Sequence, residues 1–298
     1  MKKSAFIKYV SSSFLFGLNG IVASFIALDS THIVLLRTLL GSAFLILLFL
    51  VSGGRFTFYK HKKQSLFLAI SGVAMGASWM FLYEAYARIG VSIATLIYYC
   101  GPVIVMVLSP IVFKEKLTLP KIIGFLAVLG GVFLINGNAF EGKGDVFGIV
   151  CGLLSAVTYA FMVIFNKKAE NITGLENSAL QLLISFLTVA VFIGVTQGFG
   201  MSISRSDILP ALILGLINTG IGCWLYFSSI GDLPVQTVAV CGYLEPLSAV
   251  LFSVILLNET MTVIEIAGAV LILGGALFGE LKKRGFGSVG SLFSINMW

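Results

Sequence analysis

Residues 99–131 occur a second time, without a gap, as residues 243–275. The two segments are 144 positions apart and share 11 identities over 33 positions. The identical pairs are Tyr99/Tyr243, Pro102/Pro246, Ser109/Ser253, Ile111/Ile255, Glu115/Glu259, Thr118/Thr262, Ile122/Ile266, Gly124/Gly268, Leu129/Leu273, Gly130/Gly274 and Gly131/Gly275. Because Pro, Glu, Tyr and Gly are among them, a shared apolar composition does not explain the match. The chain is therefore predicted to contain two copies of one unit.

The composition indicates the environment of these copies. Hydrophobic residues make up 58% of the chain and charged residues 11%, whereas soluble domains carry about 25% charged residues. Apolar segments near the roughly 20 residues that span a bilayer cover residues 5–27, 31–51, 65–88, 91–112, 120–136, 145–166, 176–198, 207–229, 233–257 and 262–280. A single span in lipid must satisfy its own backbone groups, so each is expected to be a helix. The predicted fold is an all-α membrane protein with ten transmembrane helices.

The first apolar segment resembles a signal peptide, since Lys2 and Lys3 precede it. It has no convincing A-x-A cleavage site, and cleavage would remove one span from the first copy. We expect it to be the first helix.

The positive charges predict the orientation. With the N-terminus in the cytoplasm, 15 of the 19 Lys and Arg residues lie on the inner side and Arg88, Lys143 and Arg205 lie outside. This bias follows the positive-inside rule. We expect a multi-pass protein of the inner (plasma) membrane, surrounded by the lipid bilayer, with both termini cytoplasmic. Charges at span ends also argue against nucleic acid as a partner.

Each copy contains five predicted spans, and an odd number inverts the second copy relative to the first. We predict two inverted five-helix repeats, residues 1–140 and 141–281, followed by a cytoplasmic tail, residues 282–298. Transporters with inverted repeats bind their substrates near the midplane, where the repeats meet. Candidate site residues are therefore sought in the middle of the spans.

Proline stands at equivalent positions in the fourth and ninth spans. Pro102 and Pro246 each free the carbonyl four residues earlier, which belongs to Tyr98 and Gly242. In a bilayer such carbonyls need a neighbouring helix, water or a ligand. A pair of kinked helices lining a cavity and a pair of kinks that only serve packing are both open. The pairing across the repeat favours the cavity.

Aromatic residues lie on the same helix faces. Tyr99 and Tyr243 precede the two prolines by three residues and so share their face. Aromatic rings suit apolar, aromatic or cationic groups of a solute, although helix packing is the alternative for each of them. The candidate substrate-binding residues of this kind are Trp79, Tyr83, Tyr98, Tyr99, Trp224, Tyr226 and Tyr243.

Glu245 is a charged residue near the middle of the ninth span, directly before Pro246. A charge at that depth costs about 3 kcal/mol or more. Three roles are open: a ligand for an amino or cationic group, a carboxylate that carries the coupling proton, and a hydrogen-bonding residue that joins helices. We favour a functional role, and Gly101 at the equivalent position makes the halves differ here.

Arg37 and Glu84 form a second candidate, for coupling or gating. Both are expected within about 10 Å of the outer surface, from the 1.5 Å rise per residue of a helix. They could pair with each other, and a structural ion pair or an outer gate is favoured over direct binding of the solute. Asn19 and Gln181 are candidates for the cavity wall or for bonds between helices.

Two further patterns are assigned no chemistry. Glu115 and Glu259 follow the fourth and ninth spans and are predicted to be structural, as loop and cap signals. Residues 137–144 nearly match a phosphate-binding loop, but Gly144 replaces the required Ser or Thr. We expect no cofactor and no metal.

Together these features resemble the drug/metabolite transporter superfamily, in particular its ten-helix EamA-type members. The resemblance rests on YEAYARIG, then a proline, KEKLT and GxxxxxGG in the first copy, and on YLEP, LNETMT and GxxxxxGG in the second. Arg37 matches an arginine that these proteins often carry early in their second helix. The resemblance implies two inverted halves around a central cavity and the transport of amino acids, other metabolites or toxic compounds.

The predicted function is secondary transport of a small organic solute by alternating access, with export of an amino acid or related metabolite preferred. Protons are a candidate coupling ion, and a monomer and a homodimer are both open. A multidrug exporter, a passive facilitator or channel, and a lipid flippase are the alternatives. An enzyme is not expected, because no nucleophile–base set is visible.

Overall fold

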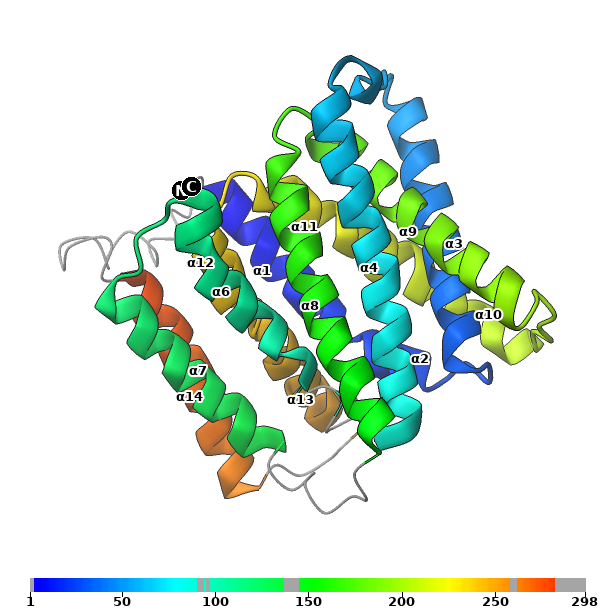
Figure 1. The fold of residues 1–298 in the computed structure, drawn as a ribbon. Helices are drawn as coiled ribbons and strands as arrows, with labels where there is room; N and C mark the ends of the chain where they lie inside the picture. The colour runs from blue at the N-terminus through cyan, green and yellow to red at the C-terminus, as the bar shows by residue number, and fades with distance from the viewer. Residues whose placement is uncertain (1–2, 90–93, 95–96, 137–144, 258–261, 282–298) are drawn as a thin grey trace, which may run out of the picture.

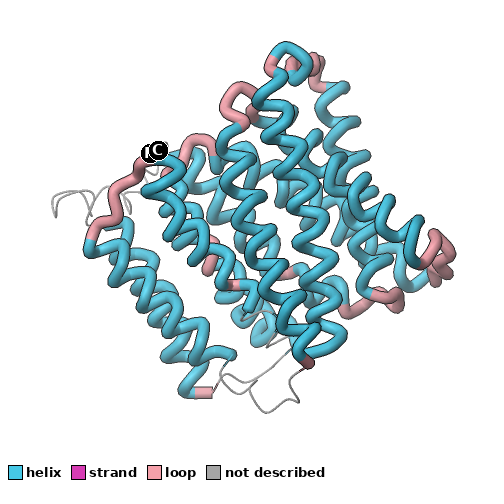
Figure 2. The backbone as a smooth tube through the Cα atoms, viewed as in Figure 1, coloured by secondary structure: helices cyan, strands magenta, loops and turns pink. Residues whose placement is uncertain are grey.

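The computed structural model describes residues 3–89, 94, 97–136, 145–257 and 262–281. This part of the chain is helical, with short loops and no strand (Figure 2). Glu259, the loop 137–144 and the predicted tail 282–298 lie outside the described residues.

Among the described residues, six helical stretches are long and apolar enough to cross a membrane. The first joins α1 (Lys3–Gly17) to α2 (Asn19–Ala23), and the sixth joins α10 (Arg205–Leu212), the π-helical turn η3 (Ile213–Ile221) and α11 (Gly222–Ile230). The others are α3 (Ser30–Val51), α4 (Lys62–Ile89), α8 (Val146–Lys168) and α9 (Gly174–Thr196). A 3-10 turn, η1 (Phe58–Lys60), lies between α3 and α4.

Five further helices complete the described structure. They are α6 (Cys100–Phe113), α7 (Leu119–Asn136), α12 (Val235–Cys241), α13 (Leu244–Leu257) and α14 (Val263–Leu281). The starts of α6 and α13, and those of α7 and α14, are 144 residues apart, the same distance that separates the repeated segments. The start of α1 and the end of α14 lie at the same end of the bundle (Figure 1).

The two repeated prolines stand at helix starts. Each is the third residue of its helix, Pro102 in α6 and Pro246 in α13. Proline is tolerated in a first turn, where its missing N–H has no partner to lose. The sequence predicted kinked helices, whereas the structure ends α12 at Cys241 and begins α13 at Leu244.

The interruption before α13 keeps its backbone hydrogen-bonded. The carbonyl of Gly242, which the sequence predicted to be freed by Pro246, accepts the N–H of Glu245 at 3.1 Å. The N–H of Gly242 in turn donates to the carbonyl of Val238 at 3.0 Å. A new helix therefore starts inside the protein and brings Glu245 into its first turn.

Helices α7 and α14 pack side by side at one edge of the molecule (Figure 1). A Cβ added to Gly131 would lie 2.5 Å from the carbonyl oxygen of Gly268, and one added to Gly275 would lie 2.5 Å from that of Gly124. Both distances are far below van der Waals contact. Glycine is therefore required at these two positions for the backbones to approach, as in other membrane helix pairs.

The outer surface of the bundle is apolar. Val51, Ile111, Val195 and Val263 are 77–83% exposed, and many other large apolar side chains are exposed with them. An apolar surface of this extent needs a non-aqueous environment. Together with the six long apolar helices it identifies a multi-pass membrane protein.

Polar residues inside the bundle bond between helices. The amide group of Asn166 on α8 donates to the Oδ1 of Asn177 at 3.0 Å and to the Oε1 of Gln181 at 3.2 Å, both on α9. The Nε2 of Gln181 lies 3.6 Å from the sulfur of Met75 on α4. Of the two roles left open for Gln181, the structure shows the bond between helices.

Candidate functional site

Two adjoining cavities lie between the helices. The first, here called the wide cavity, has a volume of about 640 Å³ and reaches the end of the bundle where α2 passes into α3. The second, the deep cavity, has a volume of about 60 Å³. Both are lined by Phe16, Asn19, Trp79, Tyr98 and Glu245. The wide cavity falls in the size range of small-molecule sites.

Glu245 stands where the two cavities meet. It is the second residue of α13, so its carboxylate is near the positive end of that helix. No side-chain hydrogen bond or ion pair of Glu245 is present among the described residues. The carboxylate is therefore available to a solute in either cavity.

Arg37 lines the wide cavity from α3 and is 4% exposed. Its Nε donates to the hydroxyl of Thr219 at 3.0 Å, and its guanidinium carbon lies 4.4 Å from the centre of the Trp79 ring. The Thr219 hydroxyl donates to the carbonyl of Leu214 at 2.7 Å, within the π-helical turn η3. The Nη2 of Arg37 is buried without a hydrogen-bond partner in the described structure.

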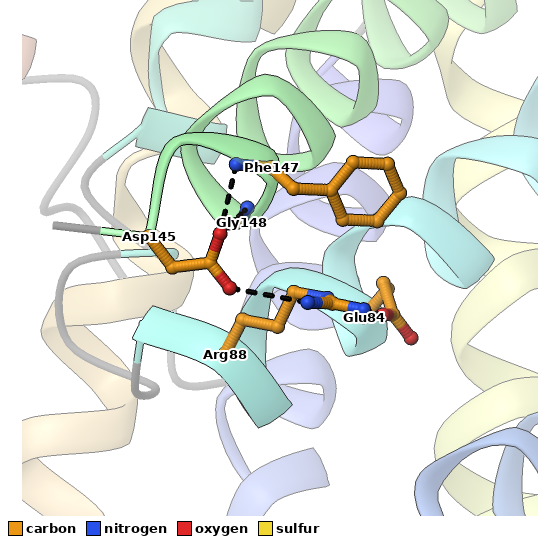
Figure 3. Close-up of polar contacts among 5 residues, drawn as sticks. All are labelled: Glu84, Arg88, Asp145, Phe147 and Gly148. Atoms are coloured by element: carbon orange, nitrogen blue, oxygen red, sulfur yellow. Dashed lines mark hydrogen bonds and ion pairs between the residues drawn. The ribbon is translucent and has the colours of Figure 1, made fainter.

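Glu84 pairs with Arg88 instead of the expected Arg37. The Nε of Arg88 lies 2.5 Å from the Oε1 of Glu84, and its Nη1 lies 3.1 Å from the Oδ2 of Asp145 (Figure 3). The ion pair between Arg37 and Glu84 is absent from the described part of the chain. Glu84 is one turn from Arg88 on the same helix, which makes the local pair easier to form.

The Arg88 cluster joins the end of α4 to the start of α8. The Oδ1 of Asp145 accepts the N–H groups of Phe147 at 2.9 Å and Gly148 at 3.4 Å, which caps α8 (Figure 3). The guanidinium of Arg88 also lies 4.6 Å from the centre of the Phe147 ring. The hydrogen bond from Arg88 lowers the pKa of Asp145 below its usual value, and the backbone bonds act in the same direction. The side chains of Glu84 and Arg88 are 45% and 41% exposed, outside the cavities.

Four of the aromatic residues named from the sequence face the wide cavity. They are Trp79, Tyr83, Tyr98 and Tyr99. Tyr226 faces the deep cavity, and its hydroxyl is buried.

Two aromatic residues predicted for the site lie elsewhere. Tyr243 is fully buried behind Tyr99, with the ring centres 5.7 Å apart. Trp224 is absent from the described lining of both cavities, and the ammonium of Lys8 lies 5.6 Å from its ring centre.

Sequence reasoning missed Tyr9 and Tyr159, which both line the deep cavity. The Tyr159 ring meets Tyr98 edge-on at 5.4 Å, and Tyr9 is 5.3 Å from Tyr226. Neither tyrosine belongs to the repeated segments. A tyrosine in the middle of an apolar span was the available signal.

The end of the bundle opposite the wide cavity is held by hydrogen bonds. The Tyr9 hydroxyl donates to the carbonyl of Val238 at 2.8 Å. The carboxylate of Glu115 accepts the N–H groups of Val235 at 2.8 Å and Gln236 at 3.3 Å. Glu115 thus caps α12, a helix 120 residues away in the chain. It was expected to be structural, and the structure identifies the helix that it caps.

A larger cavity of about 880 Å³ lies at this same end and shares no lining residue with the wide or deep cavity. Several of its polar groups are already bonded. Glu115 caps α12, the Lys167 ammonium donates to the carbonyls of Leu233 and Ile230, and the Lys121 ammonium bonds to Gln236. The wide cavity, with the unpartnered Nη2 of Arg37, is therefore the better candidate for the solute site.

The family model of the EamA-like transporter family matches the chain twice, over residues 3–137 and 146–279. The chain belongs to the EamA-like transporter family. The family and the names of its relatives identify a transporter rather than an enzyme. A small-molecule substrate and a lipid environment follow from this membership.

Relatives of known sequence cover most of the chain. The uncharacterized transporter YxxF of Bacillus subtilis (strain 168) is 26% identical over 297 residues, 97% of this chain and 93% of the relative. The threonine/homoserine exporter RhtA of Escherichia coli (strain K12) is 26% identical over 250 residues, 84% of this chain and 81% of the relative. A probable amino-acid metabolite efflux pump of Salmonella typhimurium is 28% identical over 207 residues, 64% of this chain and 69% of the relative.

Solved structures share the fold. One crystal structure matches with a TM-score of 0.81 and 18% sequence identity. The match covers 95% of this chain and all of the solved chain.

Proposed function

We propose that this EamA-like transporter is a secondary transporter that exports an amino acid or related metabolite across the inner membrane by alternating access. The observation that carries the proposal is Glu245, a carboxylate at an internal helix start where the wide and deep cavities meet. A charge at that depth is expensive unless it serves a solute or a coupling ion. The names of two relatives, a threonine/homoserine exporter and a probable amino-acid metabolite efflux pump, support the substrate class.

The proposed architecture is ten transmembrane helices in two inverted repeats, residues 1–140 and 141–281. Its support is the pattern of helix packing. Helix α4 packs on α8 and α11 packs on α1, while α6 packs on α8 and α13 packs on α1. Let α1 correspond to α8, α4 to the stretch α10–η3–α11, and α6 to α13. A two-fold rotation that exchanges the repeats then turns the α4–α8 contact into the α11–α1 contact, and the α6–α8 contact into the α13–α1 contact. The pair α7 and α14 maps onto itself.

Alternating access follows from that exchange. The wide cavity reaches the end where α2 meets α3, and the hydrogen bonds of Tyr9 and Glu115 hold the opposite end. With both termini in the cytoplasm, this shape is the outward-facing state. Two similar halves that swap shapes give an inward-facing state of comparable free energy.

The proposal is tested by flux in proteoliposomes. Glu245→Gln keeps the shape of the side chain and removes its charge, so efflux of a transported amino acid should fall or lose its dependence on pH. Glu170→Gln, which changes an exposed glutamate outside both cavities, is the matched control and should retain the flux. Flux of Glu245→Gln equal to that of the wild type at every pH removes Glu245 from the mechanism.

The aromatic walls favour a multidrug exporter as the second candidate. Trp79 and Tyr98 face both cavities beside Glu245, a combination that suits aromatic cations. Overexpression should then protect cells against a panel of aromatic cationic inhibitors. A passive facilitator is separated from both exporters by the absence of counter-transport in the same vesicles.

A further inference from the structure

We propose that Arg37 and Glu245 form one subsite for the head group of an α-amino acid, in which Arg37 binds the carboxylate and Glu245 binds the ammonium group. The inference rests on the proposed function and specifies the chemistry of its solute.

The guanidinium of Arg37 has an unmet binding capacity. It is a permanent cation with five N–H donors, and it is 96% buried, since only 4% of the residue is exposed. The described structure gives it one hydrogen bond, from Nε to Thr219, and leaves Nη2 without a partner. A buried charged donor without an acceptor is costly. A carboxylate in the wide cavity is the group that would satisfy it.

The position of this free edge is fixed by two contacts. The Trp79 ring covers the face of the guanidinium at 4.4 Å, and Thr219 holds Nε at 3.0 Å. These contacts restrict rotation about the side chain and hold the guanidinium beside the wide cavity, which Arg37 lines. Trp79 and Thr219 are positioning residues in this arrangement. Planar two-point binding of a carboxylate is the geometry for which arginine is suited.

Glu245 supplies the opposite charge in the same cavity. It lines the wide cavity with Arg37, yet the described residues contain no ion pair between them within 4.0 Å. The two charges therefore face a common space without neutralising each other by contact. The buried Oδ1 of Asn19, which also lines this space, has no hydrogen-bond partner and adds an acceptor for an ammonium group.

A zwitterion meets these requirements with one molecule. Its carboxylate would accept hydrogen bonds from the guanidinium of Arg37. Its ammonium group would donate to the carboxylate of Glu245 and to the side-chain oxygen of Asn19. A primary amide, a decarboxylated amine or a deaminated acid lacks one of the two charges. Each should bind at least about tenfold more weakly than the amino acid, because a hydrogen bond to a buried charge is lost.

The test measures binding to the purified full-length protein. The twenty standard L-amino acids are first screened by thermal stabilisation in detergent. Dissociation constants are then measured for L-threonine and L-phenylalanine, or for the amino acids that stabilise the protein most, together with their amides and deaminated acids. The variants are Arg37→Gln, Arg37→Lys, Glu245→Gln and Thr219→Val.

We expect each variant to lose the selectivity for the one charged group of the solute that its residue binds. Arg37→Gln should bind the acid and the amide equally, while Arg37→Lys retains part of the preference for the acid. Glu245→Gln should lose the preference for the amino acid over the deaminated acid. Thr219→Val removes the same Nε hydrogen bond as Arg37→Gln but keeps the charge, so it should still prefer the acid.

Two results overturn the inference in different ways. If wild-type protein binds an amino acid and Arg37→Gln still prefers the acid to its amide, the subsite is wrong and the proposed function stands. If none of the twenty amino acids binds the wild-type protein, the subsite and the amino-acid part of the proposed function fail together. A folded Thr219→Val protein excludes general damage around η3 as the cause of a selectivity change.

Discussion

The hydroxyl of Tyr243 donates a hydrogen bond to the carbonyl oxygen of Tyr99, 2.6 Å away. The two residues occupy the same position in the repeated segments, 144 residues apart. Each stands next to a helix start, Tyr99 before α6 and Tyr243 before α13. The bond therefore joins the two places where the chain begins a new helix inside the bundle.

Removal of this hydroxyl should weaken the junction. Tyr243→Phe leaves the buried Tyr99 carbonyl without its donor, at a cost of about 1 kcal/mol. We expect a lower midpoint of thermal unfolding in detergent. Tyr99→Phe is the matched control because the Tyr99 hydroxyl does not make this bond, and its midpoint should stay closer to that of the wild type. Equal midpoints for wild type and Tyr243→Phe would show that the bond adds no stability.

Adjacent glycines in α7 and α14 should respond differently to substitution by alanine. Gly131→Ala and Gly275→Ala place a Cβ 2.5 Å from a backbone oxygen of the other helix, so the helices must move apart at a cost of about 1–3 kcal/mol. At Gly130 and Gly274 an added Cβ meets nothing within 4 Å. Alanine there should leave stability unchanged or raise it by about 0.5–1 kcal/mol, because glycine is unfavourable inside a helix.

Thermal unfolding of the four single variants decides this prediction. The two groups should separate, with Gly131→Ala and Gly275→Ala below the wild type. If all four variants unfold together, the close approach of α7 and α14 is incorrect.

The ionisation of Asp145 should make the stability of the folded protein depend on pH in the acid range. Its pKa is lowered first by the hydrogen bond from Arg88. A carboxyl group with a pKa lower in the folded than in the unfolded state stabilises the protein above its unfolded pKa, near 3.9. The stabilisation is lost as pH falls through the lower folded value.

The difference in unfolding midpoint between wild type and Asp145→Asn should therefore be present at pH 7 and shrink below about pH 4. Circular dichroism melts over this range measure it. A difference that stays constant at all pH values would show that the Asn side chain, and not the lost charge, causes the effect.

The Glu84–Arg88 ion pair leads to a prediction for variants in which the charges of Arg37 and Glu84 are both reversed. Glu84 forms its ion pair with Arg88, whereas Arg37 bonds to Thr219. Combining Arg37→Glu with Glu84→Arg should therefore not restore the flux that Arg37→Glu removes. Glu84→Gln alone should change stability by about 1 kcal/mol or less, because exposed ion pairs contribute little. Recovery of flux in the double variant would establish contact between Arg37 and Glu84 in another state.

The sequence located several site residues but not their partners. Glu245 and the two prolines stood out because a charge or a proline in an apolar span is unusual by itself. A proline in a helix kink and a proline in a first turn look the same in sequence, so the interruption before α13 could not be predicted. Arg37 was paired with Glu84 because both were expected at the same depth. Its observed partner, Thr219, is 182 residues away and is brought near by packing of α3 against η3.

The Glu115 cap should protect the first backbone amides of α12, at the end of the bundle opposite the wide cavity, from exchange with solvent. Its carboxylate accepts the first two N–H groups of α12, and Pro234 at the preceding position offers no side-chain cap. Glu115→Ala should expose these amides and loosen the first turn of α12.

Hydrogen–deuterium exchange followed by mass spectrometry should show faster exchange in a peptide that covers residues 235–241, because local opening costs less free energy. Glu84→Ala removes a carboxylate at the end of α4 and should leave that peptide unchanged. Wild-type exchange in Glu115→Ala would mean that the α12 amides are protected by the surrounding helices and not by the Glu115 cap.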